Sequence, residues 1–370
     1  VGDKLKKIGI IAEYNPLHNG HLYHFEEVKR LANPDLIITI ISSSFTMRGD
    51  LSIYDKFAKA NQVLMLGSDI VLELPFMYTL ERADIFANNT VVFLNLANVD
   101  EIWIGSEENN IELYEKCYKN ETNISIDNST SLKRNTLNKY PFSSNDLLGY
   151  FYYKRIKDKN YKIELKTIKR IKSSYNSKEL ESDDIASATS IRYNLDKIKQ
   201  YCPKFVYENK NKKDENILFP FIKYKLLSSS NNELKNIFMV DEGIENRLLT
   251  IDNINSLEEL IEYLSNKKYS HTRIKRMLIY ILMNITKTDT NEILNNDISF
   301  IRVLGFNDIG KDYLNKIKKD IKIYTNIKNT DHLALAIELK ISKILDSIYN
   351  TNLLELEQRG PLRGEKNDKN

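Results

Sequence analysis

The sequence predicts an α/β protein: a doubly wound parallel sheet forms the first half of the chain, and an all-α part follows it. Two observations support this fold class. Up to about residue 170, short apolar runs rich in β-branched residues alternate with longer amphipathic runs, which is typical of buried parallel strands joined by helices. After about residue 196, amphipathic runs continue without an evident strand between them. Because ligands of such sheets bind at the carboxyl ends of the strands, functional residues are expected to follow the strands.

Five short apolar or alternating runs are the expected strands. Most are followed by Gly, Pro or a polar loop, as is usual where buried strands end. The expected strands are residues 8–12, 36–41, 70–74, 101–104 and 161–168. The expected helices of this half are residues 21–31, 55–66, 82–96 and 146–157, and the Asn- and Ser-rich residues 118–136 are expected to form a loop.

The second half shows four amphipathic patterns with helical spacing. They cover residues 233–240, 256–265, 272–285 and 331–348. The chain is therefore expected to divide into an α/β domain over residues 1–195 and a helical domain over residues 196–357. The Gly-, Lys- and Asn-rich residues 358–370 are expected to be a disordered tail.

The composition is that of an ordinary globular protein and argues against several other classes. The 370 residues are 42% hydrophobic and 28% charged, and no apolar run approaches the roughly 18 residues of a membrane span. Cys117 and Cys202 are far apart and form no CxxC pattern, which argues against a disulfide scaffold or a zinc ribbon. Residues 1–7 lack the apolar stretch of a signal peptide, so a cytoplasmic location without a membrane partner is expected.

Charge is unevenly distributed along the chain. Residues 1–110 carry 9 Lys and Arg against 15 Asp and Glu, whereas residues 111–370 carry 45 against 36. A basic second half is typical of a protein that binds nucleic acid. An AT-rich genome that fills surfaces with Lys and Asn produces the same bias, so charge alone leaves both interpretations open.

The strongest local signal is the segment EYNPLHNGH over residues 13–21, which leaves the first expected strand and enters the first expected helix. Gly20 allows a ligand to approach the backbone closely, and the helix N-terminus presents free N–H groups to a phosphate. His18 and His21 can donate hydrogen bonds to charge that develops on a phosphoryl group. The segment therefore indicates a nucleotide site. A zinc site lacks an evident third ligand, and simple helix capping by the histidines is the other alternative.

A second signal is the segment ASATSIR over residues 186–192. Hydroxyl groups at the start of a helix, followed by Arg192, are suited to the phosphates of a nucleotide. Alone this pattern is weak, because Ser and Thr before a helix are usually only N-caps. In the same chain as the histidine segment it becomes much more specific.

Together the two segments resemble the HIGH-type nucleotidylyltransferase superfamily, whose members carry an HxGH turn and an ISSTxxR-like turn in one Rossmann-like domain. The resemblance implies that His18 and His21 are catalytic and stabilise the transition state at the α-phosphate of ATP while pyrophosphate leaves. It also implies that Ser187, Thr189 and Arg192 contact the pyrophosphate side.

The longer segment EYNPLHNGHLYH is similar to the signature of the bacterial tRNA(Met) cytidine acetate ligases. Further matching segments follow in the same order along nearly the whole chain, which a chance motif does not do. They are SFTMRG at 44–49, GSDIVLELP at 67–75, ADIFA at 83–87, IGSE at 104–107, SNDLLG at 144–149, ASATSIR at 186–192, EGIENR at 242–247, TRIKR at 272–276 and IRVLGFN at 301–307.

The resemblance implies an enzyme that activates acetate with ATP and modifies elongator tRNA(Met). Acetyl-AMP forms and pyrophosphate leaves, and the exocyclic amine of the wobble cytidine then attacks the acetyl group to give N4-acetylcytidine and AMP. Residues 1–195 would bind ATP and acetate, and residues 196–357 would bind the tRNA. The implied ATP contacts are Ile11, Ala12, Glu13, Tyr14, Asn15, Pro16, Leu17, His18, Asn19, Gly20, His21, Leu22, Tyr23, His24, Gly105, Asn145, Arg170, Ser187, Thr189 and Arg192.

Three of these contacts have a physical rationale and, in two cases, a simpler alternative. Gly105 ends an expected strand at the ligand edge of the sheet. Asn145 is suited to a base or ribose, although a helix N-cap is its simpler role. Arg170 is suited to a phosphate, although a solvated surface arginine is the alternative.

The implied chemistry requires mainly positioning and charge stabilisation from the protein. Acetate itself attacks the α-phosphorus, so no protein nucleophile is required, and no proton acceptor for the amine is evident. Mg²⁺ is expected with the phosphates of ATP. The sequence shows no dedicated carboxylate cage: Glu13, Asp69 and Glu73 are the candidates, and the last two are better explained by local structure.

RNA contact is expected in the helical half, where residues 267–276 mix cations with Tyr269 and His271. Such aromatic rings can stack on splayed anticodon bases, and the cations can track phosphates. A solvated helix face is the alternative. The expected tRNA contacts are Lys267, Lys268, Arg273, Lys275 and Arg276, with further positive charge at residues 210–213 and 316–322.

The chain departs from the family pattern at four places. Met47 stands where Gln is usual, Asp50 and Leu51 replace Glu-Pro, Asn176–Ser177 replace His-Asp, and Ala188 replaces Ser. Two other functions remain open. A cofactor adenylyltransferase of the pantetheine or nicotinate type is disfavoured by the long helical half, and a non-catalytic tRNA-binding protein with a relic nucleotide site is disfavoured by the intact motifs. Nothing in the sequence indicates the oligomeric state.

Overall fold

The computed structural model describes residues 5–120, 142–171, 185–209, 212–328, 330 and 332–364. Most of the Asn- and Ser-rich residues 118–136 lie outside these ranges, as do Asn176–Ser177, Lys210 and Asn211. Within the described ranges, the first half of the chain forms the predicted doubly wound sheet.

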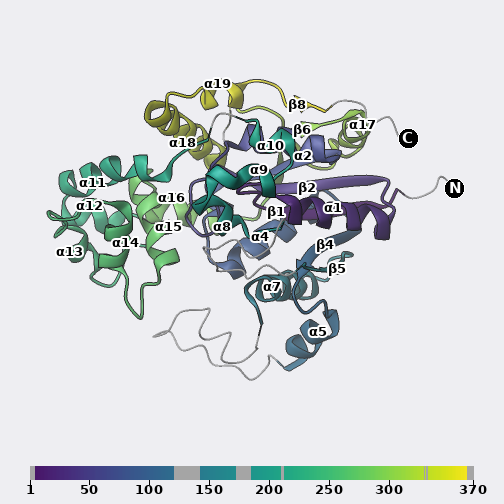
Figure 1. The fold of residues 1–370 in the computed structure, drawn as a ribbon, viewed down its shortest axis with the longest axis horizontal. Helices are drawn as coiled ribbons and strands as arrows, with labels where there is room; N and C mark the ends of the chain where they lie inside the picture. Colours follow the sequence, from purple (N-terminus) through teal and green to yellow (C-terminus); the bar gives the residue numbers. More distant parts are fainter. Residues whose placement is uncertain are drawn as a thin grey trace.

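Five parallel strands form the centre of the sheet, with helices above and below it (Figure 1). They are β1 Lys7–Ala12, β2 Leu36–Ser42, β3 Ile70–Leu74, β4 Glu101–Ser106 and β5 Glu164–Lys169. Each agrees with an expected strand to within a few residues. Their spatial order is β5–β4–β1–β2–β3, so the strand order reverses between β1 and β4. The carboxyl ends of these two strands are where such a sheet binds its ligand.

Two helices of this half, α2 and α7, begin at a residue whose side chain caps them. Asp55 caps α2 by accepting a hydrogen bond from the backbone N–H of Ala58 at 2.8 Å, and Gly67 ends the helix with a φ of 109°. Ser143 caps α7 in the same way. The helices are α1 Asn19–Ala32, α2 Lys56–Leu66, α3 Phe76–Thr79, α4 Ala83–Leu96, α5 Ile111–Asn120 and α7 Ser144–Asp158.

The prediction of an all-α second half is wrong, because strands after residue 195 join the same sheet. β6 (Phe300–Phe306) lies antiparallel to β3, and the short β7 (Lys322–Tyr324) and β8 (Leu362–Arg363) pair with β6. Every residue of β6 is buried. A short run buried on both faces shows no alternation that separates it from a buried helix, so its periodicity did not reveal it. The predicted disordered tail is also wrong where β8 lies within it.

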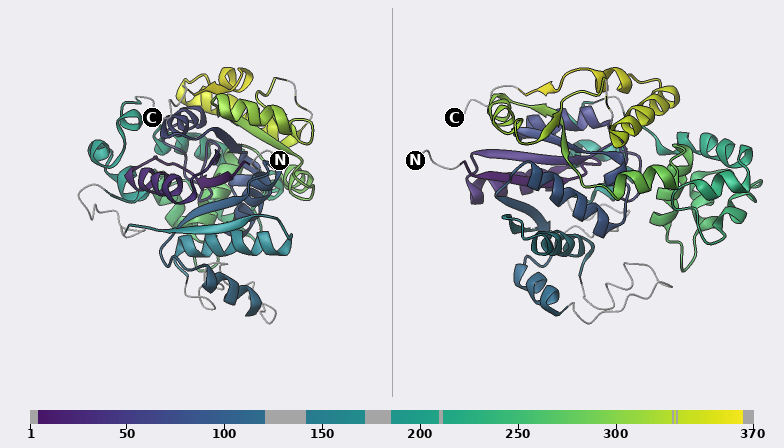
Figure 2. Two further views of the ribbon diagram at one scale, coloured as in Figure 1. Left: turned by 90° about the vertical axis from the view of Figure 1, so that its right-hand side faces the viewer. Right: turned by 180° about the vertical axis from the view of Figure 1, so that it is seen from behind.

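Helices α11 to α16 form a lobe at one end of the molecule, beside the sheet rather than over it (Figures 1 and 2). They are α11 Phe219–Ser228, α12 Asn231–Asn236, α13 Ile244–Leu248, α14 Leu257–Leu264, α15 His271–Leu282 and α16 Lys287–Leu294. Before the lobe come α8 Ala188–Tyr193, α9 Ile198–Tyr201 and α10 Lys204–Tyr207; after it, α17 Asp308–Ile317, α18 Leu333–Tyr349 and α19 Leu353–Gln358 return to the sheet. The chain thus leaves the sheet to build the lobe and then comes back.

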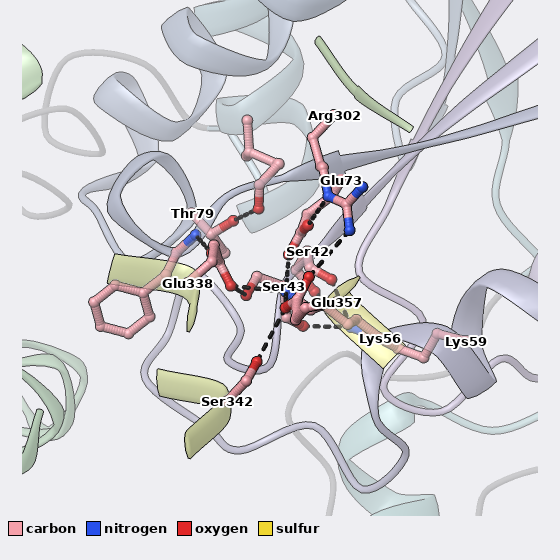
Figure 3. A network of polar contacts seen from close by, with 12 residues as sticks. Ser42, Ser43, Lys56, Lys59, Glu73, Thr79, Arg302, Glu338, Ser342 and Glu357 are labelled. Atoms are coloured by element: carbon pink, nitrogen blue, oxygen red, sulfur yellow. Dashed lines mark hydrogen bonds and ion pairs between the residues drawn. The ribbon is translucent and has the colours of Figure 1, made fainter. Parts of the chain in front are cut away.

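A buried ionic cluster fastens the returning helices to the sheet (Figure 3). Lys56 of α2 places its Nζ 2.6 Å from Glu73 of β3 and 2.8 Å from Glu338 of α18, and it also pairs with Glu357 of α19. Arg302 of β6 pairs with Glu357 at 3.0 Å. All five side chains are at most 1% exposed. Because a buried charge without a partner is strongly unfavourable, the cluster holds α18 and α19 in one position.

Candidate active site

A cavity of about 230 Å³ opens at the carboxyl ends of β1, β4 and β5, where the strand order reverses. Most of the predicted ATP contacts line it. They are Ile11, Ala12, Glu13, Tyr14, Asn15, His18, Gly20, His21, Tyr23, His24, Gly105, Asn145, Arg170, Ser187, Thr189 and Arg192. Pro16, Leu17, Asn19 and Leu22 are not among the lining residues. Leu17 is wholly buried in the core, and Asn19 donates to the carbonyl of Gln200 at 3.2 Å.

The histidine turn forms a reciprocal cap at the start of α1. The backbone N–H of Gly20 donates to Nδ1 of His18 at 3.1 Å, and the backbone N–H of His18 donates to Nδ1 of His21 at 3.2 Å. The two rings lie with their centroids 3.8 Å apart. Because both Nδ1 atoms accept hydrogen bonds, each neutral ring carries its proton on Nε2. The histidines therefore do cap the helix, but they do so with Nδ1, and the Nε2–H group remains the donor of each ring.

Burial keeps these rings neutral. Burial, together with the charges of Arg170 and Arg192, lowers the pKa of His18 to about 3. Burial and the neighbouring His18 hold the pKa of His21 well below its usual value. Burial and Arg170 likewise lower the pKa of His24 to about 4. The rings can therefore stabilise a developing negative charge by donating hydrogen bonds, without becoming protonated.

Arg170 follows β5 and lies across the end of β4. A Cβ on Gly105 would come within 3.2 Å of Cγ of Arg170, so the glycine leaves room for the arginine. Glu107 lies 3.2 Å from Nε of Arg170 and accepts a hydrogen bond from the side-chain amide of Asn145 at 2.5 Å. Since Ser143 caps α7, Asn145 is not the helix cap of the simpler interpretation. Glu107 positions both side chains, although sequence reasoning gave it no role beyond the family match at residues 104–107.

The second motif reaches the same cavity and is tied to the first. Ser187 caps the short helix α8 by accepting a hydrogen bond from the backbone N–H of Ser190 at 3.1 Å. Arg192 donates from Nη1 to the carbonyl of Asn15 at 2.7 Å, and its Nη2 lies 3.4 Å from the hydroxyl of Thr189. The two segments that the sequence separates by more than 160 residues therefore form one site.

A segment between β2 and α2 also lines the cavity, although sequence reasoning gave it no role beyond the family match. Its lining residues are Thr46, Met47, Arg48 and Asp50. The backbone N–H of Met47 donates to Oε1 of Glu13 at 2.6 Å. At the base of this segment, the fully buried Lys59 donates from Nζ to the carbonyls of Ser42 and Ser43 at 2.9 and 3.0 Å (Figure 3). Lys59 thereby holds the end of β2 and the start of the segment in place.

The outer end of the predicted RNA-binding stretch lies on the lobe. Lys267 and Lys268 are exposed just before α15. Arg273 lies over the ring of Tyr269, 4.3 Å from its centroid. Tyr269 is buried and donates its hydroxyl hydrogen to the carbonyl of Asp241 at 2.7 Å. The prediction that Tyr269 stacks on bases is therefore wrong, because its ring is already covered.

The inner end of the same stretch faces the catalytic half. Arg276 is only 8% exposed and donates from Nη1 to the carbonyl of Glu81 at 2.9 Å, so the prediction that it contacts RNA is wrong. Lys275 pairs with Asp50 at 2.5 Å. Of the other cationic stretches, Lys213 is buried, and residues 316–322 begin at the last turn of α17, which lies at the end of the molecule away from the lobe (Figure 1). The predicted cations thus do not form one continuous surface.

The carboxylates named as metal candidates are engaged with protein groups. Glu13 accepts the N–H of Met47, and Asp69 accepts a hydrogen bond from the side chain of Asn307 at 2.7 Å. Glu73 belongs to the buried cluster with Lys56. Within the described ranges, no group of three or more His, Cys, Asp or Glu side chains is placed to hold a metal ion. Nor does any helix of this part of the chain have the length and apolar character needed to cross a membrane.

The strand order, the histidine turn and the second motif together define a nucleotidyl transferase of the HIGH type. A family profile described as HIGH Nucleotidyl Transferase matches residues 5–359. The "tRNA(Met) cytidine acetate ligase" of Caldicellulosiruptor saccharolyticus is 35% identical, and the match covers 92% of this chain and 93% of that protein. The protein of the same name from Oceanobacillus iheyensis is 33% identical, with 96% and 98% covered. The chain belongs to this family of HIGH nucleotidyl transferases, the tRNA(Met) cytidine acetate ligases.

Two solved structures share the fold. Thermotoga maritima TmcAL in an apo form has a TM-score of 0.83 and 23% identity, and the match covers 97% of this chain and 99% of that one. The same protein bound with alpha-thio ATP has a TM-score of 0.82 at 23% identity, with 97% and 100% covered. The whole arrangement of sheet and lobe is therefore shared with these proteins.

Proposed function

We propose that this protein activates acetate with ATP and transfers the acetyl group to the wobble cytidine of elongator tRNA(Met). The observation that carries the proposal is the pair His18 and His21. Two neutral imidazoles, protonated at Nε2, meet at a helix N-terminus where the strand order of the sheet reverses. Arg170 and Arg192 lie at the same cavity and supply positive charge for a polyphosphate. The names of the relatives suggest acetate and tRNA(Met) as the other substrates.

In the first step, a carboxylate oxygen of acetate attacks the α-phosphorus of ATP. The bond from that phosphorus to the bridging oxygen breaks, acetyl-AMP forms and pyrophosphate leaves. His18 and His21 would donate hydrogen bonds to the charge that grows on the phosphoryl oxygens, and Arg192 would balance the charge of the pyrophosphate. Since acetate is itself the nucleophile, the chain needs only to align the reactants and stabilise charge.

In the second step, the exocyclic amine of the cytidine attacks the acetyl carbonyl and AMP leaves. The products are N4-acetylcytidine, AMP and a proton. Mg²⁺ is expected to accompany the phosphates of ATP. Within the described part of the chain, Glu13 and Asp50 are the carboxylates that line the cavity, and they are engaged with Met47 and Lys275. They do not fit a cage for the ion, which would be held by the nucleotide itself. These substrates also imply a cytoplasmic location.

The first test is acetate-dependent exchange of label between pyrophosphate and ATP, which needs no tRNA. We expect His21→Ala to lower the exchange rate by at least about a hundredfold, because a donor to the transition state is lost. Its thermal unfolding should stay close to that of the wild type. His271→Ala removes an exposed histidine of α15 and should leave the exchange unchanged. Undiminished exchange in His21→Ala would remove this residue from the mechanism.

The second arm of this test uses labelled acetate, ATP and a mixed tRNA pool. The label should appear at the wobble cytidine of elongator tRNA(Met), and only when ATP is present. Label in a different tRNA, or in none while exchange proceeds, would contradict the proposed acceptor and leave the activation step standing.

A further inference from the structure

We propose that Asp50 is a positioning residue that joins Lys275 of the helical lobe to Arg192 of the nucleotide site. The lobe would thereby set the position of the arginine that faces the pyrophosphate. This inference rests on the proposed function, because it takes Arg192 as a phosphate contact. It also gives Lys275 a different role from the RNA contact that its sequence context predicts.

One face of α15 contacts the catalytic half of the chain. Lys275 pairs with Asp50 at 2.5 Å, and Arg276 donates to the carbonyl of Glu81 at 2.9 Å. One turn further along, the hydroxyl of Tyr280 donates to the carbonyl of Leu80 at 2.7 Å. The helix therefore docks by directed polar contacts as well as by apolar packing.

The contact between α15 and the catalytic half is very close at Gly49. A Cβ on Gly49 would lie 2.7 Å from the backbone nitrogen of Arg276 and 2.8 Å from Cβ of Lys275. Gly49 also has a φ of 87°, which disfavours any side chain. The cavity-lining segment that ends at Asp50 thus packs directly on the backbone of α15, and a shift of the helix would move the segment.

Asp50 lies between the cations of Lys275 and Arg192. Its Oδ1 lies 2.5 Å from Nζ of Lys275, and its Oδ2 lies 3.4 Å from Nη2 of Arg192. The Asp50 side chain is 13% exposed. Burial alone would raise the pKa of Asp50, but the charges of Lys275 and Arg192 hold it below its usual value. Asp50 is therefore an ionised carboxylate that interacts with both cations. Asp50 lines the cavity, whereas Lys275 is not among the lining residues.

A second carboxylate near this pair does not replace Asp50. Glu215 lies 4.0 Å from Lys275. Burial and the nearby Asp50 raise the pKa of Glu215 to about 7, against the opposing charge of Lys275, so near neutral pH it is only partly ionised. Asp50 is consequently the main counter-charge for both cations, and the link between lobe and nucleotide site depends on it.

The experiment is the acetate-dependent pyrophosphate exchange with Asp50→Asn, Lys275→Met and the double variant. We expect each single variant to lower kcat by about tenfold to a hundredfold, as a misplaced positioning group does. The KM for ATP should separate them. Asp50→Asn removes a negative charge beside the phosphates, so its KM should not rise. Lys275→Met leaves the negative charge of Asp50 less compensated beside the phosphates, so the KM for ATP of this variant should rise.

The double variant tests whether the two residues act through one link. Its kcat should be no lower than that of the poorer single variant, because the link is already broken. Multiplied effects, or an unchanged kcat in Asp50→Asn, would overturn the proposal. So would full exchange in Lys275→Met, which is the result that an RNA-contact role predicts, since no tRNA is present. Lys275→Arg, which keeps the charge, should restore most of the rate.

A matched control lies in the same lobe. Lys287 of α16 pairs with Asp241 at 2.7 Å but lies on the surface, away from the cavity. Lys287→Met should leave kcat and KM unchanged, and a loss equal to that of Lys275→Met would overturn the proposal. If the wild-type protein shows no exchange, the proposed function fails. ATP binding by calorimetry then still tests the link, because Lys275→Met should raise the Kd for ATP in the wild-type chain but not in Asp50→Asn. An equal rise in both backgrounds would overturn the link.

Discussion

His18 and His21 meet at the start of α1 with both Nδ1 atoms occupied by backbone N–H groups. Burial keeps both rings neutral and leaves Nε2–H as the donor. Lys59 shows the same effect on a cation. Burial lowers its pKa to about 7, although the charge of Glu13 opposes the shift. At the scale of single residues, burial therefore keeps the histidines neutral and weakens the charge of Lys59, whereas Asp50 stays charged because Lys275 and Arg192 lower its pKa.

The neutral state of His18 predicts a pH dependence of stability. Its pKa is about 3 in the folded chain, against about 6.5 when unfolded. As the pH falls below 6.5, the unfolded chain binds a proton that the folded chain does not. The contribution of the neutral ring is therefore present above pH 6.5 and is lost as the pH falls towards 3. Between pH 7 and pH 5 this loss amounts to about 2 kcal/mol for one such group.

The comparison variant is His18→Asn, which keeps an N-cap acceptor but cannot titrate. We expect the wild type to lose about 2 kcal/mol more of its free energy of unfolding than His18→Asn when urea denaturation is measured at pH 7 and at pH 5. Parallel losses in both proteins would show that His18 is protonated as readily in the folded chain as in the unfolded one.

At the scale of elements, α2 organises the molecule through two buried lysines three residues apart. Lys59 holds the end of β2 beside the cavity, and Lys56 binds carboxylates from β3, α18 and α19. One turn of one helix thereby supports both the segment beside the cavity and the C-terminal helices, and Figure 3 shows the two lysines with their partners.

We expect Lys56→Met to lower the free energy of unfolding by about 3–5 kcal/mol, because removing one partner leaves buried carboxylates uncompensated. Lys119 forms a pair with Glu115 at the same 2.6 Å, but its side chain is 70% exposed. Lys119→Met should leave stability nearly unchanged, because solvent screens an exposed ion pair. Chemical denaturation of both variants checks this, and equal losses would mean that burial of the cluster does not matter.

At the scale of the whole molecule, the chain runs from the sheet into the lobe and back into the sheet. β6 pairs with β3 after the lobe is complete, and α15 contacts the cavity segment. The lobe is therefore joined to the sheet where the chain enters it and where the chain leaves it, and α15 contacts the catalytic half directly. Lys267 and Lys268 are exposed just before α15, and we expect this part of the lobe to contact the tRNA.

We expect Lys267→Ala/Lys268→Ala to weaken tRNA binding by roughly three- to tenfold and to reduce the slope of log K against log salt by one to two, because two phosphate contacts are lost. Acetate-dependent exchange should be unaffected. Binding titrations at several salt concentrations measure both effects. Lys318→Ala/Lys319→Ala removes two exposed lysines just after α17, at the other end of the molecule, and should have a smaller effect. The reverse order would place the tRNA elsewhere.

The sequence by itself determined the parallel part of the sheet and the two nucleotide motifs. Their signals are local: an apolar run such as Leu36–Ser42 is buried wherever it lies, and the turn around Gly20 owes its chemistry to neighbours in the chain. Capping residues such as Asp55 and Ser143 act within their own helices. Local pattern is therefore sufficient for these elements.

Only the tertiary structure decided which distant residues share a contact. Phe300–Phe306 forms a strand by pairing with the edge of β3. Its own apolar pattern does not distinguish a strand from a buried helix. In the sequence, Lys275 and Arg276 belong to a basic stretch. In the structure, Lys275 pairs with Asp50 and Arg276 donates a hydrogen bond to the carbonyl of Glu81, so both contact the catalytic half. Long-range pairing and burial assign such roles, and neither is encoded in the spacing of residues along one segment.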